Sequence, residues 1–266
     1  MPKILISNDD GVHAPGIQAL ARALDQVGEV TVLAPERNWS AAGHPKTMHK
    51  PLRVKPVTWP DGRTVYASNG APSDCVALGI MGALGDEPFD LVVSGINAGH
   101  NLGTDVFYSG TVAAAMEANI HGVPAIAVSL GSVHEDESVD QGEALALAGQ
   151  VAARLARTVL EKGLPSHVLL NVNVPNLPPE RLRGAQVTRL GRRIYRDVLI
   201  RREDPWGRPY FWIGGEMPTG IPEDGSDVGA VENGHVSVTP VGVDLTKYDF
   251  MDVLRAWGVE ESLVPA

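Results

Sequence analysis

Hydrophobic positions in the first two thirds of the chain follow two alternating periods. Short runs of consecutive apolar residues predict buried strands, at residues 3–7, 30–33, 90–94, 124–130 and 168–174. Stretches with apolar residues every three to four positions predict helices between them, at residues 17–27, 73–84, 111–120 and 141–161. This alternation predicts βαβ crossovers, so residues 1–180 are expected to form a Rossmann-like α/β core, a mostly parallel sheet with helices on both faces.

The pattern changes after residue 180. Residues 187–213 carry a run of arginines and an aromatic cluster, followed by short alternating pieces and Gly/Pro turns. We interpret residues 181–266 as C-terminal β-hairpin extensions packed on the core, with a strand at 235–239 and a terminal helix at 250–257. The basic and aromatic segment is expected to contact another subunit. The alternative is stacking of a nucleotide base on Trp206, Tyr210 or Trp212.

The net charge, the cysteine content and the hydropathy of the chain limit which molecules it is expected to bind. The 266 residues are 44% hydrophobic and carry a formal net charge of −10, which argues against charge-driven binding to a nucleic-acid polymer or an anionic membrane. The single cysteine, Cys75, cannot form an internal disulfide, and no apolar run approaches the about 20 residues of a membrane span. We therefore expect a cytoplasmic protein with no membrane contact, which binds any phosphate locally through a metal or backbone donors.

The strongest local motif is Asn8-Asp9-Asp10-Gly11, directly after the first predicted strand. Ligands of open α/β sheets bind beyond the carboxyl ends of strands, so this turn lies where a site is expected. Two adjacent carboxylates favour a hard divalent cation such as Mg²⁺, Mn²⁺ or Ca²⁺, and the alternative is a solvated turn in which one Asp caps the next helix. The Asn8 amide has two interpretations as well: contact with a substrate oxygen, or stabilisation of the turn. Without a metal these acids would repel the phosphates of a dinucleotide, so a nicotinamide or flavin enzyme is not indicated.

A second motif covers residues 94–111, between a predicted strand and an alanine-rich helix. Ser109-Gly110-Thr111 at the helix start offers free backbone N–H groups and hydroxyls, which favour an anion such as phosphate. The alternative is an ordinary Ser or Thr N-cap. Asn97 and Asn101 add polar side chains to the same glycine-rich stretch, and this density favours a ligand site.

A third loop, residues 35–43, follows the second predicted strand. Neighbouring parallel strands bring such loops together, so Ser40 or Asn38 could reach the cleft of Asp9 and Asp10; the alternative is a simple turn.

Other reactive side chains give weaker signals. No paired histidine motif supports a zinc hydrolase. His13, His44 and His100 lie in the candidate loops as acid–base candidates, although a structural or surface role is individually expected for each. Cys75 begins an apolar helix and is predicted to be a core residue.

Together these stretches resemble the SurE family, the survival protein E phosphatases. The resemblance spans nearly the whole chain, and the matching segments are residues 6–11, 14–17, 34–40, 70–76, 93–115, 171–175, 204–208 and the tail 226–240. Departures occur at Trp39, at residues 41–44 and at Val241. They touch none of the residues implied as ligands, so they bear on substrate preference more than on activity.

The resemblance implies a function and its residues. The family hydrolyses nucleoside 5′-monophosphates, with 3′-nucleotides and short polyphosphate as further substrates, uses one Mg²⁺ or Mn²⁺ per subunit, and forms homodimers or homotetramers that exchange C-terminal segments. The residues that match its metal ligands are Asp9, Asp10, Ser40 and Asn97. The residues that match its phosphate-binding group are Asn101, Ser109, Gly110 and Thr111.

These assignments lead to a mechanistic hypothesis. We assign catalytic roles to Asp9, Asp10 and Asn8, and expect metal-activated water to attack the phosphorus, because both acids are committed to the ion. Two other classes remain open: a metal-dependent nucleotide-sugar glycosyltransferase, which releases nucleotide from a sugar donor, and a non-catalytic nucleotide-binding module, which shows no turnover. The ordered motifs favour the phosphatase.

Overall fold

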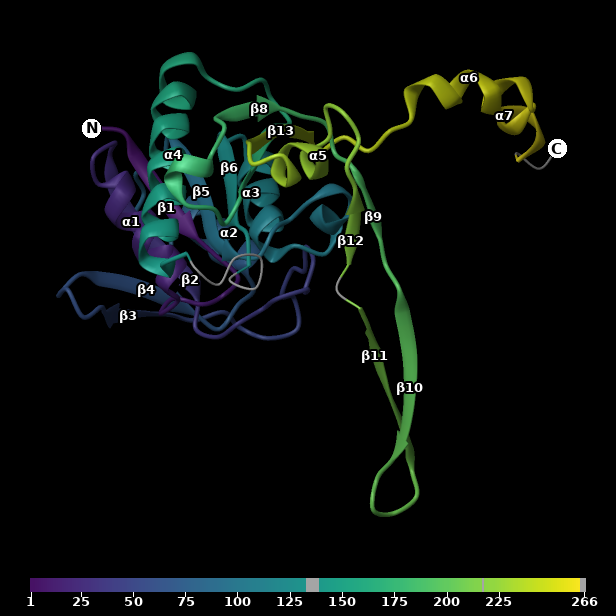
Figure 1. The fold of residues 1–266 in the computed structure, drawn as a ribbon, viewed down its shortest axis with the longest axis horizontal. Helices are drawn as coiled ribbons and strands as arrows, with labels where there is room; N and C mark the ends of the chain where they lie inside the picture. Colours follow the sequence, from purple (N-terminus) through teal and green to yellow (C-terminus); the bar gives the residue numbers. More distant parts are fainter. Residues whose placement is uncertain (133–138, 217, 264–266) are drawn as a thin grey trace.

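The computed structural model describes residues 1–132, 139–216 and 218–263. Within them, nine strands form one central sheet (Figure 1). Their spatial order is β3 (Val54–Thr58), β4 (Thr64–Ser68), β2 (Glu29–Pro35), β1 (Lys3–Ser7), β5 (Leu91–Ala98), β6 (Ala125–Leu130), β7 (Val168–Val174), β13 (Val236–Gly242) and β8 (Ala185–Val187). The run from β4 to β7 is parallel, whereas β3 pairs antiparallel with β4 and β13 with β7. The predicted mostly parallel sheet is confirmed.

Helices cover both faces of this sheet because its central strands are apolar on both sides. In β1, Ile4 and Ile6 belong to one core cluster and Leu5 belongs to the other, and all three side chains are fully buried. Helices α1 (Pro15–Leu24) and α4 (Gln141–Lys162) cover the first face, and α2 (Pro72–Ile80) and α3 (Gly110–Ile120) cover the second. The consecutive apolar residues of β1 therefore place its carboxyl end between two helical layers.

The pair α1 and α4 shows how small residues set the packing. A Cβ on Gly149 of α4 would lie 2.9 Å from the Cβ of Ala23, so glycine permits the close approach of the two helices. Helix α4 begins where the Asp140 carboxylate accepts a hydrogen bond from the Glu143 amide at 2.9 Å, and it ends at Gly163 with a positive φ.

The C-terminal third adds a long hairpin and a separate arm. Strands β9 (Arg192–Ile194) and β12 (Thr219–Ile221) pair at the base of the hairpin, and β10 (Asp197–Glu203) and β11 (Pro209–Gly215) extend from it, away from the sheet (Figure 1). Short elements close the list: η1 (Gly103–Phe107), η2 (Pro179–Arg181), α5 (Asp227–Glu232), α6 (Tyr248–Ala256) and α7 (Val259–Ser262). Helices α6 and α7 stand apart from the sheet in Figure 1. Among the described helices, none has the length and apolar character needed to cross a membrane.

Several expected boundaries differ from the structure. The sheet does not end near residue 180, because β8 and β13 from the predicted extension complete it. Helix α2 ends at Ile80 instead of residue 84, because Gly82 adopts a positive φ that does not continue a right-handed helix. Strand β5 continues beyond residue 94 to Ala98, since pairing with β6 resumes after an irregularity. The hairpin of β3 and β4 was not predicted.

Candidate metal and phosphate site

The turn after β1 is held by Asn8. Its Nδ2 donates to the Gly11 carbonyl at 3.0 Å, and its Oδ1 accepts from the Gly11 amide at 3.2 Å. Asn8 is fully buried, and Gly11 has a φ of +104° that favours glycine. The geometry therefore supports the turn-stabilising interpretation of Asn8, and a direct catalytic contact stays a prediction.

Asp9 lies against the first turn of α3. The Thr111 hydroxyl donates to Asp9 Oδ1, and a Cβ on Gly110 would lie 2.7 Å from the Asp9 Cβ. Burial raises the pKa of Asp9, and hydrogen bonds from the Thr111 hydroxyl and from the amides of Gly110 and Thr111 oppose that rise. The start of α3 is thus built to hold a carboxylate at the tip of β1.

Asp10 reaches the end of the neighbouring strand. Its Oδ2 accepts a hydrogen bond from the Ala98 amide at 3.3 Å. Burial and the nearby charge of Asp9 both raise the pKa of Asp10. Asp10 therefore connects the turn after β1 to the carboxyl end of β5, and the carboxylate pair follows the first strand, where the sequence predicts a ligand site.

The loop after β2 joins the same place. The Trp39 amide donates to the Asp9 carbonyl at 2.8 Å, so this loop passes beside the turn that carries Asp9 and Asp10. Ser40 is the next residue of the loop. Ser40 is exposed, and its amide donates to Asn38 Oδ1 at 2.7 Å. This arrangement assigns Asn38 to the loop and leaves the Ser40 hydroxyl available for a ligand.

Asn97, at the end of β5, has a fixed orientation. Its Nδ2 donates to the Gly99 carbonyl at 2.7 Å, and no donor from the described residues is bonded to its Oδ1. The side chain thus keeps an oxygen for a cation and uses its nitrogen within the protein.

The donor set fits a hard divalent cation. Across residues 1–132, 139–216 and 218–263, neither Asp9 nor Asp10 forms an ion pair with a Lys, Arg or His side chain. In the same residues no cluster of three or more His, Cys, Asp or Glu side chains could hold a metal, so a metal at Asp9 and Asp10 would need neutral oxygens as further ligands. Two carboxylates, an amide oxygen and a hydroxyl are ligands that Mg²⁺ or Mn²⁺ prefer over zinc.

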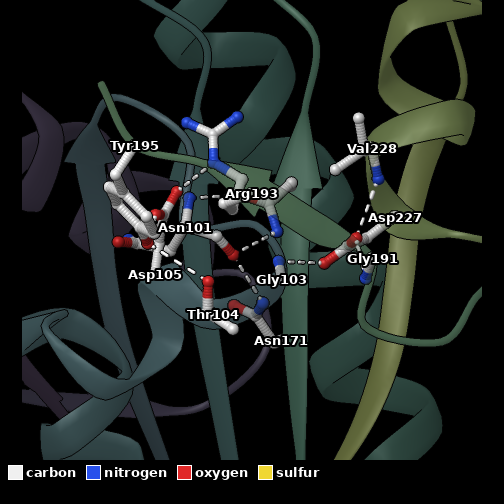
Figure 2. A network of polar contacts seen from close by, with 11 residues as sticks. Asn101, Gly103, Thr104, Asp105, Asn171, Gly191, Arg193, Tyr195, Asp227 and Val228 are labelled. Atoms are coloured by element: carbon white, nitrogen blue, oxygen red, sulfur yellow. Dashed lines mark hydrogen bonds and ion pairs between the residues drawn. The ribbon is translucent and has the colours of Figure 1, made fainter. Parts of the chain in front are cut away.

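The residues predicted to bind phosphate are engaged within the protein. Ser109 Oγ accepts from the Val112 amide at 3.1 Å, so the N-cap interpretation of Ser109 is confirmed. Asn101 is buried between strands, and its Nδ2 donates to Ser129 Oγ at 2.8 Å while its carbonyl accepts from Asn171 (Figure 2). Phosphate contacts by Asn101, Ser109, Gly110 and Thr111 stay a prediction.

The candidate histidines His44 and His100 have hydrogen-bond partners other than Asp9, Asp10, Ser40 and Asn97. His44 Nε2 is 2.8 Å from Glu117 Oε2 on α3, and this hydrogen bond holds the pKa of Glu117 at about 2 despite burial. His13 is exposed, and His100 Nε2 is 3.1 Å from the Val174 carbonyl. The contacts of His44 and His100 and the exposure of His13 agree with the structural or surface roles expected of these histidines. Cys75 is fully buried, and burial raises the pKa of its thiol, which confirms its place in the core.

Sequence reasoning missed a polar network behind the site. Asp105, Arg193, Tyr195 and Asp227 tie the loop after β5 to the base of the hairpin (Figure 2). Partners so distant along the chain leave no local pattern. The one available signal was the pair Asn171 and Asn173, two alternate polar residues in an otherwise apolar strand, which indicates buried hydrogen bonds.

The fold and the paired carboxylates define a class: open α/β sheets whose ligands bind beyond the carboxyl ends of parallel strands. The sequence profile of the family described as "Survival protein SurE" matches residues 4–197. A relative from Herpetosiphon aurantiacus, named 5′-nucleotidase SurE, is 54% identical over 251 residues, or 94% of this chain and 96% of that protein. A relative of the same name from Chloroflexus aggregans is 51% identical over 96% of this chain and 98% of that protein.

The solved structures agree with the sequence comparison. The crystal structure of the SurE protein from Aquifex aeolicus matches with a TM-score of 0.80 and 40% identity, covering 97% of this chain and 100% of that chain. This chain belongs to the SurE family, and the resemblance seen in its motifs is confirmed.

Proposed function

We propose that this chain, a 5′-nucleotidase of the SurE family, hydrolyses nucleoside 5′-monophosphates with one Mg²⁺ or Mn²⁺ ion per subunit. One observation carries the metal site: two carboxylates meet at the tip of β1, and both have pKa values raised by burial. A divalent cation would relieve the repulsion between the buried Asp9 carboxylate and the half-buried Asp10 carboxylate.

Four residues would hold this ion. Asp9 and Asp10 supply charge, and Asn97 Oδ1 and the Ser40 hydroxyl supply neutral oxygens that keep the site from repelling a phosphate dianion. When bound, the ion supplies Lewis-acid chemistry, that is, neutralisation of phosphate charge and activation of a water molecule. Thr111 would orient the Asp9 carboxylate through its hydroxyl, and Asn8 would hold the turn that carries Asp9.

The phosphate is proposed to lie beside Asp9, near the start of α3. Gly110 approaches Asp9 closely, so a phosphate held by an ion on this carboxylate would be near the positive end of the helix dipole, which favours an anion. In this proposal Asn101, Ser109, Gly110 and Thr111 form the second side of the phosphate site. Because both acids would be committed to the ion, water is the proposed nucleophile, and a phosphorylated aspartate trapped by rapid acid quench would contradict this.

A phosphate-release screen tests the proposed function. With Mg²⁺ or Mn²⁺, nucleoside 5′-monophosphates are expected to yield inorganic phosphate, and a chelator is expected to abolish the release because the carboxylates then have no ion to hold. The 3′-nucleotides and short polyphosphate belong in the same screen as further proposed substrates. Release of nucleotide from a nucleotide sugar would favour the glycosyltransferase instead, and nucleotide binding without turnover would favour the binding module.

We also propose that the chain assembles as a homodimer or homotetramer through the hairpin and the C-terminal arm. The hairpin exposes large apolar side chains, with Trp212 64% and Ile213 80% exposed, as expected of a surface that another subunit covers. Serine at both positions is expected to shift the sedimentation coefficient toward the monomer, whereas Met81→Ser, which changes an exposed residue after α2, should leave it unchanged. A double variant that sediments like the parent would contradict this interface.

A further inference from the structure

The loop after β5 is fastened by side chains from the base of the hairpin. Asp105 of η1 lies 2.8 Å from Arg193 Nε, measured to its Oδ2, and its Oδ1 accepts from the Tyr195 hydroxyl at 2.5 Å (Figure 2). The side chains of Arg193 and Asp105 are only 14% and 16% exposed. This ion pair is therefore largely removed from water and is screened much less than a surface pair.

Asp105 leads directly to the first turn of α3. Its backbone carbonyl accepts hydrogen bonds from the amides of Tyr108 at 2.9 Å and Ser109 at 3.0 Å. Ser109 then caps α3, and the next two residues contact the Asp9 carboxylate. A displacement of Asp105 would consequently move the helix start on which Asp9 rests.

A second set of hydrogen bonds, made by Asp227, holds the loop at Gly103. Asp227, fully buried, accepts from the Gly103 amide and from the Gly191 amide, both at 2.7 Å. A Cβ on Gly103 would lie 2.4 Å from the Gly191 carbonyl, so the loop and the residue before β9 are in close contact. The loop after β5 is thus held by Asp227 at Gly103 and by Arg193 and Tyr195 at Asp105.

We infer that Arg193 and Tyr195 are positioning residues that act through Asp105 to set the orientation of Asp9. This inference rests on the proposed function insofar as Asp9 is taken as a metal ligand. It assigns the hairpin a second role, because β9 is the base from which β10 and β11 extend (Figure 1). The base of the hairpin and the metal site then form one connected unit, separated by a single loop.

The test uses the full chain with Arg193→Gln and Tyr195→Phe combined. Without the Arg193 ion pair and the Tyr195 hydrogen bond, Asp105 loses its fixed position, so we expect the Kd for Mn²⁺, measured by titration calorimetry without substrate, to rise about tenfold. Amide hydrogen exchange over residues 105–112 should accelerate, and kcat for a nucleoside 5′-monophosphate should fall more than KM rises.

Arg63→Gln with Tyr66→Phe is the matched control, because it also removes one ion pair and one phenol hydroxyl. Arg63 pairs with Asp25 and Tyr66 lies on β4, and among the described residues neither side chain has a hydrogen bond or ion pair to η1, Asp9 or Asp10, so all three measurements should equal those of the parent. An unchanged Mn²⁺ affinity in the Arg193/Tyr195 variant overturns the inference, even if its Tm falls. A parent protein that binds Mn²⁺ without hydrolysing nucleotides would contradict the proposed function, yet the comparison of Mn²⁺ affinities would still decide this inference.

Discussion

Asp10→Asn is expected to lower phosphate release by about 10³-fold and, at the same time, to make the metal-free protein harder to unfold at neutral pH. Burial and the charge of Asp9 raise the pKa of Asp10, so its ionised form opposes folding. Asparagine keeps the shape and an oxygen for the Ala98 amide but removes the charge. The activity is lost because the ion loses a charged ligand, and the stability is gained because two carboxylates no longer repel each other.

The pH dependence of this effect has a defined sign. A carboxyl whose pKa is raised on folding stabilises the folded state in acid and loses that contribution as the pH rises through its folded pKa. The Tm of the metal-free variant should therefore exceed that of the parent at pH 7, and the difference should vanish as the pH falls toward the usual value of 3.8. Asp61→Asn, in an exposed turn, is the control and should change neither activity nor this difference. Full activity in Asp10→Asn would contradict the assignment of Asp10 as a ligand.

Gly110→Ala is expected to lower kcat by about 10²-fold although the protein stays folded. Gly110 lies in the first turn of α3, where alanine favours the helix by propensity. The new Cβ would meet the Asp9 Cβ at 2.7 Å and its Oδ2 at 2.9 Å, so the carboxylate must shift away from its position. The loss of activity would then report the displacement of one ligand and not a loss of helix.

Gly142→Ala offers a matched comparison, because Gly142 also lies in the first turn of a helix. Its Cβ would meet only the end of the Asp140 carboxylate at 3.1 Å, which can adjust. Steady-state kinetics should show parental activity in this variant, and circular dichroism should show parental helix content in both. Parental kcat in Gly110→Ala would mean that the close contact with Asp9 has no catalytic consequence.

The elements that the sequence predicted well have strong local patterns. The strands that became β1, β6 and β7 are short apolar runs buried on both faces, and the helix that became α4 begins at a capping aspartate and ends at a glycine. The edge strand β3 escaped prediction because three of its five residues are polar or proline and none is buried, so it lacks the buried run that marks the other strands.

The sequence predicted which loops of the candidate site lie together, but it did not predict the contacts that their side chains make. The rule that loops at the carboxyl ends of parallel strands meet was sufficient to bring the turn of Asp9 and Asp10 beside β5 and the loop of Ser40. Residue type alone could not tell that Ser109 caps a helix or that the Asn101 amide nitrogen bonds to Ser129. A hydroxyl or an amide has the same chemistry in both roles, and only its partner distinguishes them.

The sequence by itself determined the alternation of buried strands and amphipathic helices, the turn with two acids at the first strand end, and the family. Those features are local, because burial and backbone preference act over a few neighbouring residues. Only the tertiary structure decided that Gly103 rests on Asp227, 124 positions away, and that Asp105 rests on Tyr195, 90 positions away. Such pairs form when the packed sheet brings distant loops together, and no spacing along the chain encodes them.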